Sequence, residues 1–142
     1  MFKLNENNVP SKNIFFMDRN KWFSLGILDF RLELLDHDVD NFALKFKINT
    51  VDKKGIYIVD TKDVNGIEAK DYDLYLIEAN YKEEILEKHI KECSQEELVY
   101  LLRVPNTHLS WQQANTFLIE NMGENSEFQY IHESFYNFEG DE

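Results

Sequence analysis

Two stretches in which apolar residues alternate with other residues constrain the fold of this chain most strongly. The first runs from Leu28 to Leu34, with leucine or phenylalanine at every second position and a charged residue between each pair. The second runs from Phe42 to Ile48 in a similar pattern. A period of two is typical of a strand with one buried face and one face in water. Because only the short acidic segment 36–41 joins the two stretches, we expect them to form an antiparallel hairpin.

Two shorter apolar runs follow, at residues 55–60 and 73–78, and both are dense in residues that favour strands. Near-continuous apolar runs of this length suit strands that are covered on both faces. Residues 128–132 predict one more strand near the end of the sequence.

A helical period dominates between these strands, from Tyr81 to Met122. Residues 82–91 place Ile85, Leu86, His89 and Ile90 at spacings of one, three and four, on one helical face. The segments 94–97 (SQEE) and 110–113 (SWQQ) are capping-box patterns, which predict two further helix starts. We expect those helices to end near Arg103, before Pro105, and near Met122, before Gly123.

The 142 residues suit a single domain, 1–142, with an acidic tail at 135–142. The expected fold class is α/β or α+β: one mostly antiparallel or mixed sheet with helices on one face. A 43% hydrophobic and 14% aromatic composition excludes a disordered chain.

The excess of acidic over basic residues makes some classes of binding partner a poor expectation. There are 27 acidic and 15 basic residues, a net charge of −12, so direct nucleic-acid binding is a poor expectation, because phosphate contacts need clustered lysine and arginine. Cys93 is the one cysteine, which excludes an intramolecular disulfide and suits a reducing compartment. With no apolar signal segment at the N-terminus and no membrane span, we expect a cytoplasmic protein without membrane contact.

The candidate functional residues stand at strand ends and at a helix start. Asp60 closes an apolar run, His37 follows another, His132 ends the last strand, and His108 precedes a helix cap. Ligands gather at such positions in layered α/β folds, and histidine and aspartate are good metal ligands. The competing interpretation is ordinary: solvated loop residues at His37 and His108.

Two other residues have simpler interpretations at this stage. His89 falls on the apolar face of a helix, which indicates packing or surface, and Glu78 ends a strand, where it would only cap the next helix. The sequence has no glycine-rich phosphate loop and no GxSxG motif.

At these positions the sequence resembles the C-terminal half of metallo-β-lactamase-fold hydrolases, in particular small phosphodiesterase-like or nuclease-like members common in phages and Gram-positive bacteria. The likeness covers about residues 15–134. The matching segments, in order, are 35–41 (LDHDVDN), 58–61 (IVDT), 74–81 (LYLIEANY), 107–110 (THLS) and 130–134 (YIHES).

The resemblance implies a role for each candidate. Asp60 would bridge two metal ions, zinc or manganese, with His132 as a late ligand and His37 at the metal centre. Asp60 and His108 would be the catalytic residues, with His108 touching the substrate phosphate at a helix start, where the helix dipole favours an anion.

The His-x-His-x-Asp-His loop that defines this family has no counterpart in the sequence. The resemblance therefore implies half of a two-sheet sandwich with an incomplete ligand set. Such a chain would not be a competent hydrolase alone and would need a complementing N-terminal half. Its bare sheet face would exceed the apolar patch that a monomer tolerates, so we expect a homo-oligomer or a protein partner on that face.

Two alternatives remain open. One is an acidic, non-catalytic binding or inhibitor protein, of the kind a phage encodes against a host protein, because an acidic surface can occupy a basic groove. The other is a nucleotide-binding remnant that keeps the pocket around His108 without the metals.

Overall fold

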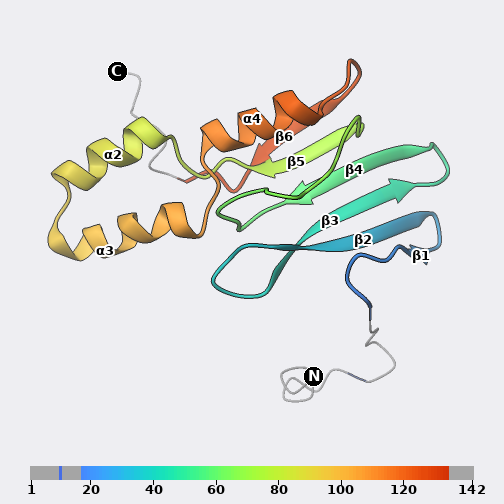
Figure 1. Ribbon diagram of the computed structural model, residues 1–142, viewed down its shortest axis with the longest axis horizontal. Helices are drawn as coiled ribbons and strands as arrows, with labels where there is room; N and C mark the ends of the chain where they lie inside the picture. Colours follow the sequence, from blue (N-terminus) through green and yellow to red (C-terminus); the bar gives the residue numbers. More distant parts are fainter. Residues whose placement is uncertain (1–9, 11–16, 135–142) are drawn as a thin grey trace.

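A computed structural model describes residue 10 and residues 17–134 of the chain (Figure 1). The expectations for the extreme N-terminus and for the acidic tail at 135–142 lie outside the described residues. The elements are β1 (Phe23–Leu25), β2 (Leu28–Leu35), β3 (Asn41–Ile48), β4 (Lys53–Ile58), β5 (Leu74–Glu78), α2 (Glu83–Glu92), α3 (Gln95–Arg103), the 3₁₀ turn Val104–Asn106, α4 (Trp111–Asn121) and β6 (Glu127–Ile131).

The strands form one six-stranded mixed sheet whose spatial order is the chain order, β1 to β6. The first four strands are antiparallel neighbours, and β4, β5 and β6 run parallel to one another. A parallel pair needs a crossover connection, and the three α-helices of the described residues lie in the crossover from β5 to β6. The expected α+β class with a mixed sheet is confirmed.

The predicted hairpin is confirmed, with Leu28 opposite Ile48 and Leu34 opposite Phe42. Both predicted capping boxes are present as well. The Ser94 hydroxyl accepts from the backbone N–H of Glu97, and the Ser110 hydroxyl accepts from that of Gln113. None of the helices among the described residues combines the length and apolar character needed to cross a bilayer.

The prediction of which hairpin face is buried was wrong. The buried face carries Glu33, Ala43 and Lys45, whose exposed fractions are 7%, 0% and 5%, while Leu34 on the other face is 49% exposed. The reason lies outside the hairpin: Val64 and Ile67 of the β4–β5 connection pack on the core over this side. Glu33 is tolerated there because its two carboxylate oxygens lie 2.8 Å from the Lys45 ammonium and 2.9 Å from the Arg31 guanidinium.

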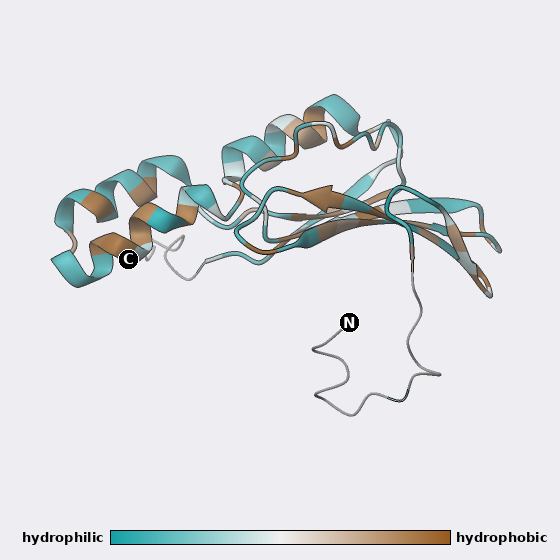
Figure 2. Cartoon of the chain, turned by 60° about the horizontal axis from the view of Figure 1, so that its bottom comes forward, coloured by the Kyte–Doolittle hydropathy of each residue, from teal (hydrophilic) through white to brown (hydrophobic). Residues whose placement is uncertain are grey.

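The other face of the sheet, which we call the open face, is apolar across five strands. Cross-strand partners share a face, and the partners on this one are Phe23, Leu25, Leu28, Phe30, Leu32, Leu34, Phe42, Leu44, Phe46, Ile48, Tyr57, Leu74 and Leu76. None of these side chains is buried. Figure 2 shows α4 on the opposite side of the sheet and the α2–α3 pair beyond the end of the sheet. The expectation that β4 and β5 are covered on both faces therefore fails for the described part of the chain.

Two hydrophobic clusters hold the helices. The main core lies between the sheet and α4, where the rings of Tyr75 and Phe117 meet edge to face at 6.4 Å. A separate small cluster holds the α2–α3 hairpin, which projects beyond the end of the sheet (Figure 1), and consists of Tyr81, Leu86, Leu101 and Val104.

Candidate metal centre

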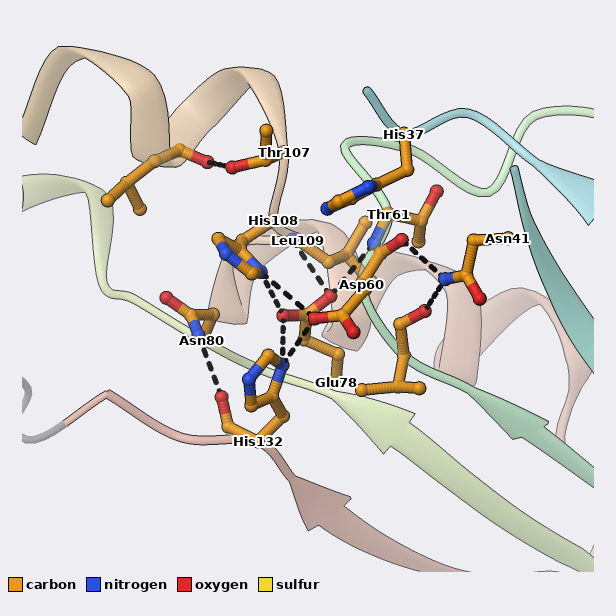
Figure 3. A network of polar contacts seen from close by, with 12 residues as sticks. His37, Asn41, Asp60, Thr61, Glu78, Asn80, Thr107, His108, Leu109 and His132 are labelled. Atoms are coloured by element: carbon orange, nitrogen blue, oxygen red, sulfur yellow. Dashed lines mark hydrogen bonds and ion pairs between the residues drawn. The ribbon is translucent and has the colours of Figure 1, made fainter. Parts of the chain in front are cut away.

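Four side chains from different parts of the chain meet at one edge of the sheet: Asp60, Glu78, His108 and His132 (Figure 3). Each offers a potential ligand atom, and these atoms all lie within 4.8 Å of one another. Asp60 follows β4, Glu78 ends β5 and His132 follows β6. Because these three strands are parallel, their carboxyl ends lie at the same edge, and His108 joins them from the segment before α4.

Glu78 lies at the centre of this group with an exposed fraction of 0%. Its Oε1 atom is 2.7 Å from Nδ1 of His108 and 2.9 Å from Nδ1 of His132. Its Oε2 atom accepts from the backbone N–H of Thr61 at 3.1 Å and of Leu109 at 3.4 Å. An ionised carboxylate can only accept, so each imidazole donates from Nδ1 and keeps Nε2 for another partner.

Asp60 lies on the outer side of the group, where its side chain is partly exposed. Its Oδ1 atom is 3.0 Å from Nδ1 of His132 and 3.6 Å from Nδ1 of His108. The two imidazole rings meet edge to face, with their centroids 5.1 Å apart. Two carboxylates and two imidazoles therefore share one small volume.

The pKa of His108 is raised above its ordinary value. The hydrogen bond to Glu78 is the largest cause, and burial opposes it. Attraction to the charges of Glu78 and Asp60 raises the pKa further, and repulsion from Arg103 lowers it. His108 therefore holds a proton to higher pH than a free histidine does.

His37 lies beside the group and is not one of its four members. Its ring centroid is 6.1 Å from that of His108. Its Nδ1 atom is 2.8 Å from Asp38, whose carboxylate also pairs with Arg103. Three of the four predicted site residues, Asp60, His108 and His132, come together, and the role of His37 as a ligand stays a prediction.

Glu78 is the residue that sequence reasoning missed. The interpretation as a helix cap was wrong, because the N-cap of α2 is Lys82, which makes no side-chain cap bond. The sequence did contain a signal for Glu78. It ends an apolar strand, and the strands before and after it along the chain also end near candidate residues, Asp60 and His132. Such a residue is buried at the sheet edge, where a carboxylate needs donors around it.

These four residues suit a divalent ion of the kind the resemblance implies. Imidazole and carboxylate are ligands for zinc, and carboxylate also suits manganese. A catalytic zinc uses three protein ligands and keeps one open position, so the four donors are enough for one ion. A second ion would need ligands beyond this group, and bridging by Asp60 stays a prediction.

Comparisons with known proteins show which solved structures share the fold of this chain. A scan against models of known protein families found no match, and a search of curated proteins found no relative. The metallo-β-lactamase-fold protein YhfI from Bacillus subtilis superposes with a TM-score of 0.60 at 14% sequence identity, over 84% of this chain and 42% of YhfI. The short form of human tRNase Z gives a TM-score of 0.46 at 17% identity, over 83% of this chain and 39% of that protein.

The chain thus spans less than half the length of either structure. At these identities the likeness concerns the fold alone, and the YhfI superposition carries it. The chain has a mixed α+β fold that resembles part of the metallo-β-lactamase fold.

Proposed function

We propose that the group formed by Asp60, Glu78, His108 and His132 binds one divalent ion, zinc or manganese. We further propose that the chain carries part of the active site of a hydrolase that cleaves phosphodiesters. The observation that carries this proposal is the convergence of two carboxylates and two imidazoles at one sheet edge. The likeness to a metallo-β-lactamase-fold structure supports the relation to metal-dependent hydrolases.

Held by these four residues, a divalent ion would supply a Lewis acid for a phosphoryl oxygen and hydroxide near neutral pH. In the metal-free protein Glu78 holds His108 through the contact to Nδ1, and the Oε2 atom of Glu78 is itself fixed by two backbone N–H groups. An imidazole that ligates an ion is neutral, so protons compete with the metal for His108, and the raised pKa of His108 strengthens that competition.

The same proposal holds that the chain is not a competent hydrolase by itself. Glu78 shares a strand face with Leu74 and Leu76, because alternate residues of a strand point to the same side, and that side is the open face. The candidate metal centre therefore borders the open face. A protein packed on that face, either a second copy or a partner that supplies the missing ligands, would form the opposite wall of the site.

Metal titration tests the first part of the proposal. Calorimetry with zinc and with manganese should show binding to the wild-type chain and none to Asp60→Ala or His132→Ala. His89→Ala is the matched control, because His89 lies in α2 outside the group, and it should bind as the wild type does. Equal affinity of all four proteins would place the metal elsewhere and contradict the proposal.

Light scattering tests the second part. The wild-type chain should exceed the monomer mass at micromolar concentration, because the open face is apolar across five strands. Leu32→Glu puts a charge into this face, and Val99→Glu puts one on an exposed position of α3 outside it. Association that survives Leu32→Glu, or a clean monomer in the wild type, would contradict a covered open face.

The open face also favours a second candidate function, an acidic binding protein without catalysis. In that case binding of a basic host protein should weaken with salt, because the net charge of −12 would contribute to it. The Asp60→Ala variant separates the two candidates, since a purely binding protein would keep its partner affinity without the metal group.

A further inference from the structure

Two residues of the candidate metal centre have an unusual backbone conformation. Among the described residues, the five with positive φ other than glycine are Asn20, Asp52, Asp60, Asp71 and His132. Asp60 has a φ of 53° and His132 a φ of 55°, both in the left-handed region that side chains with a Cβ rarely adopt. Surrounding contacts must hold such a conformation in place, and it recurs at functional sites.

An asparagine side chain holds the backbone at Asp60. The amide of Asn41 donates to the carbonyl of Val59 at 2.6 Å and to the carbonyl of Asp60 at 2.7 Å (Figure 3). Asn41 is the first residue of β3 and pairs with Leu35 of β2. Asn41, which holds the backbone at Asp60, therefore belongs to the hairpin of β2 and β3, and that hairpin supplies none of the four candidate ligands.

A second asparagine does the same at His132. The amide of Asn80 donates to the carbonyl of His132 at 2.8 Å. The backbone of Asn80 is fixed in turn, because its N–H donates to Leu109 at 2.9 Å and its carbonyl accepts from Ser134 at 2.8 Å. Asn80 is buried, so the donor of this bond lies largely out of water.

We propose that Asn41 and Asn80 are positioning residues of the candidate metal centre. Their amides keep Asp60 and His132 in the left-handed conformation from which the carboxylate and the imidazole reach the group. When either amide is removed, the residue it holds can return to a negative φ, and its Cα–Cβ bond then points in another direction. Neither asparagine is one of the four candidate ligands.

The test uses metal affinity and backbone conformation together, and the affinity part rests on the proposed function. Asn41→Ala and Asn80→Ala should each weaken zinc binding about tenfold in calorimetry, the size typical for residues that orient ligands. Asn41→Leu and Asn80→Leu keep most of the side-chain volume but cannot donate, so they should weaken binding as much as alanine does. Asn121→Ala is the matched control, since its amide also donates to a carbonyl, that of Phe117, but at the far end of α4.

A second readout needs no metal. Three-bond NMR couplings report φ, and they should show a positive φ at Asp60 and His132 in the wild type. That φ should be lost at Asp60 in the Asn41 variants and at His132 in the Asn80 variants. If the wild-type chain does not bind zinc, the proposed function fails, but the couplings still test whether Asn41 and Asn80 hold the backbone of Asp60 and His132.

Some outcomes would overturn the inference itself. One is wild-type zinc affinity with unchanged couplings in the alanine variants. Another is recovery of affinity in the leucine variants, which would mean that the asparagines only fill space.

Discussion

The Nδ1 atom of His132 and the Nδ1 atom of His108 approach the same oxygen, Oε1 of Glu78, so one buried carboxylate orients both imidazoles. We predict that Glu78→Gln lowers zinc affinity by about 10- to 100-fold, because a neutral amide replaces the buried carboxylate that both imidazoles approach. Calorimetry measures the affinity, and nitrogen chemical shifts of the two rings report the tautomer. Glu84→Gln, an exposed position on α2, should behave as the wild type does. Unchanged affinity and unchanged tautomers in Glu78→Gln would contradict the assignment.

The raised pKa of His108 predicts a specific pH dependence in the metal-free protein. The folded state binds the His108 proton more tightly than the unfolded state does, mainly through the hydrogen bond to Glu78. The stability that this proton contributes is therefore fully present below about pH 6.5, the ordinary histidine pKa, and is lost as pH rises through the folded-state value.

Urea unfolding across pH checks this. The free energy of unfolding of the wild type should exceed that of His108→Gln most at acidic pH, and the difference should shrink above the folded-state pKa. An NMR titration gives that pKa directly. A difference that grows with pH would have the wrong sign and would refute the assignment.

The buried pair of Glu33 and Lys45 predicts a non-additive pattern of stability. Lys45→Met leaves a buried carboxylate with one cationic partner fewer and should lower the free energy of unfolding by about 3 kcal/mol. Glu33→Leu with Lys45→Met removes both charges and should recover most of that loss, with the Arg31 side chain still partly in water. Urea unfolding of the two single variants and the double variant measures this. Simple additivity would mean that the charges do not interact.

Gly55 makes room for an aromatic ring on the open face. A Cβ atom at this position would lie 2.2 Å from a ring atom of Phe46, far inside contact distance. We predict that Gly55→Ala lowers stability by about 1–3 kcal/mol, the usual range for overpacking. Combined with Phe46→Leu the penalty should fall, and the double-mutant cycle would then show coupling between the two sites. Independent effects of the two changes would contradict the close approach.

Local pattern alone was enough to predict the strands and helix starts. The alternation from Leu28 to Leu34 predicts a strand whatever packs on it, and Ser94 and Ser110 cap helices through bonds to residues three positions away. It could not predict which hairpin face is covered. A period of two says that the faces differ, and the covering segment around Val64 and Ile67 is remote in sequence.

The candidate site, too, was predicted only where local pattern was enough. Asp60 and His132 were predicted because strand ends gather ligands, and the parallel arrangement of β4, β5 and β6 brings them together. Glu78 was missed because a glutamate after an apolar run looks the same whether it caps a helix or lies buried at a sheet edge. Only the hydrogen bonds from Thr61, Leu109 and the two histidines distinguish these cases.

The α2–α3 hairpin has a small cluster of its own, apart from the main core, so its amide protons should exchange with solvent sooner than those of β4 and β5. His108 is tethered to the end of this hairpin, because its backbone N–H donates to Val104 at 2.9 Å. Sub-global opening of the hairpin would remove the bond to Val104, while Leu109, buried in the main core, stays bonded to Glu78 and Asn80. A chain built this way can open one small cluster while the four side chains at the sheet edge stay together.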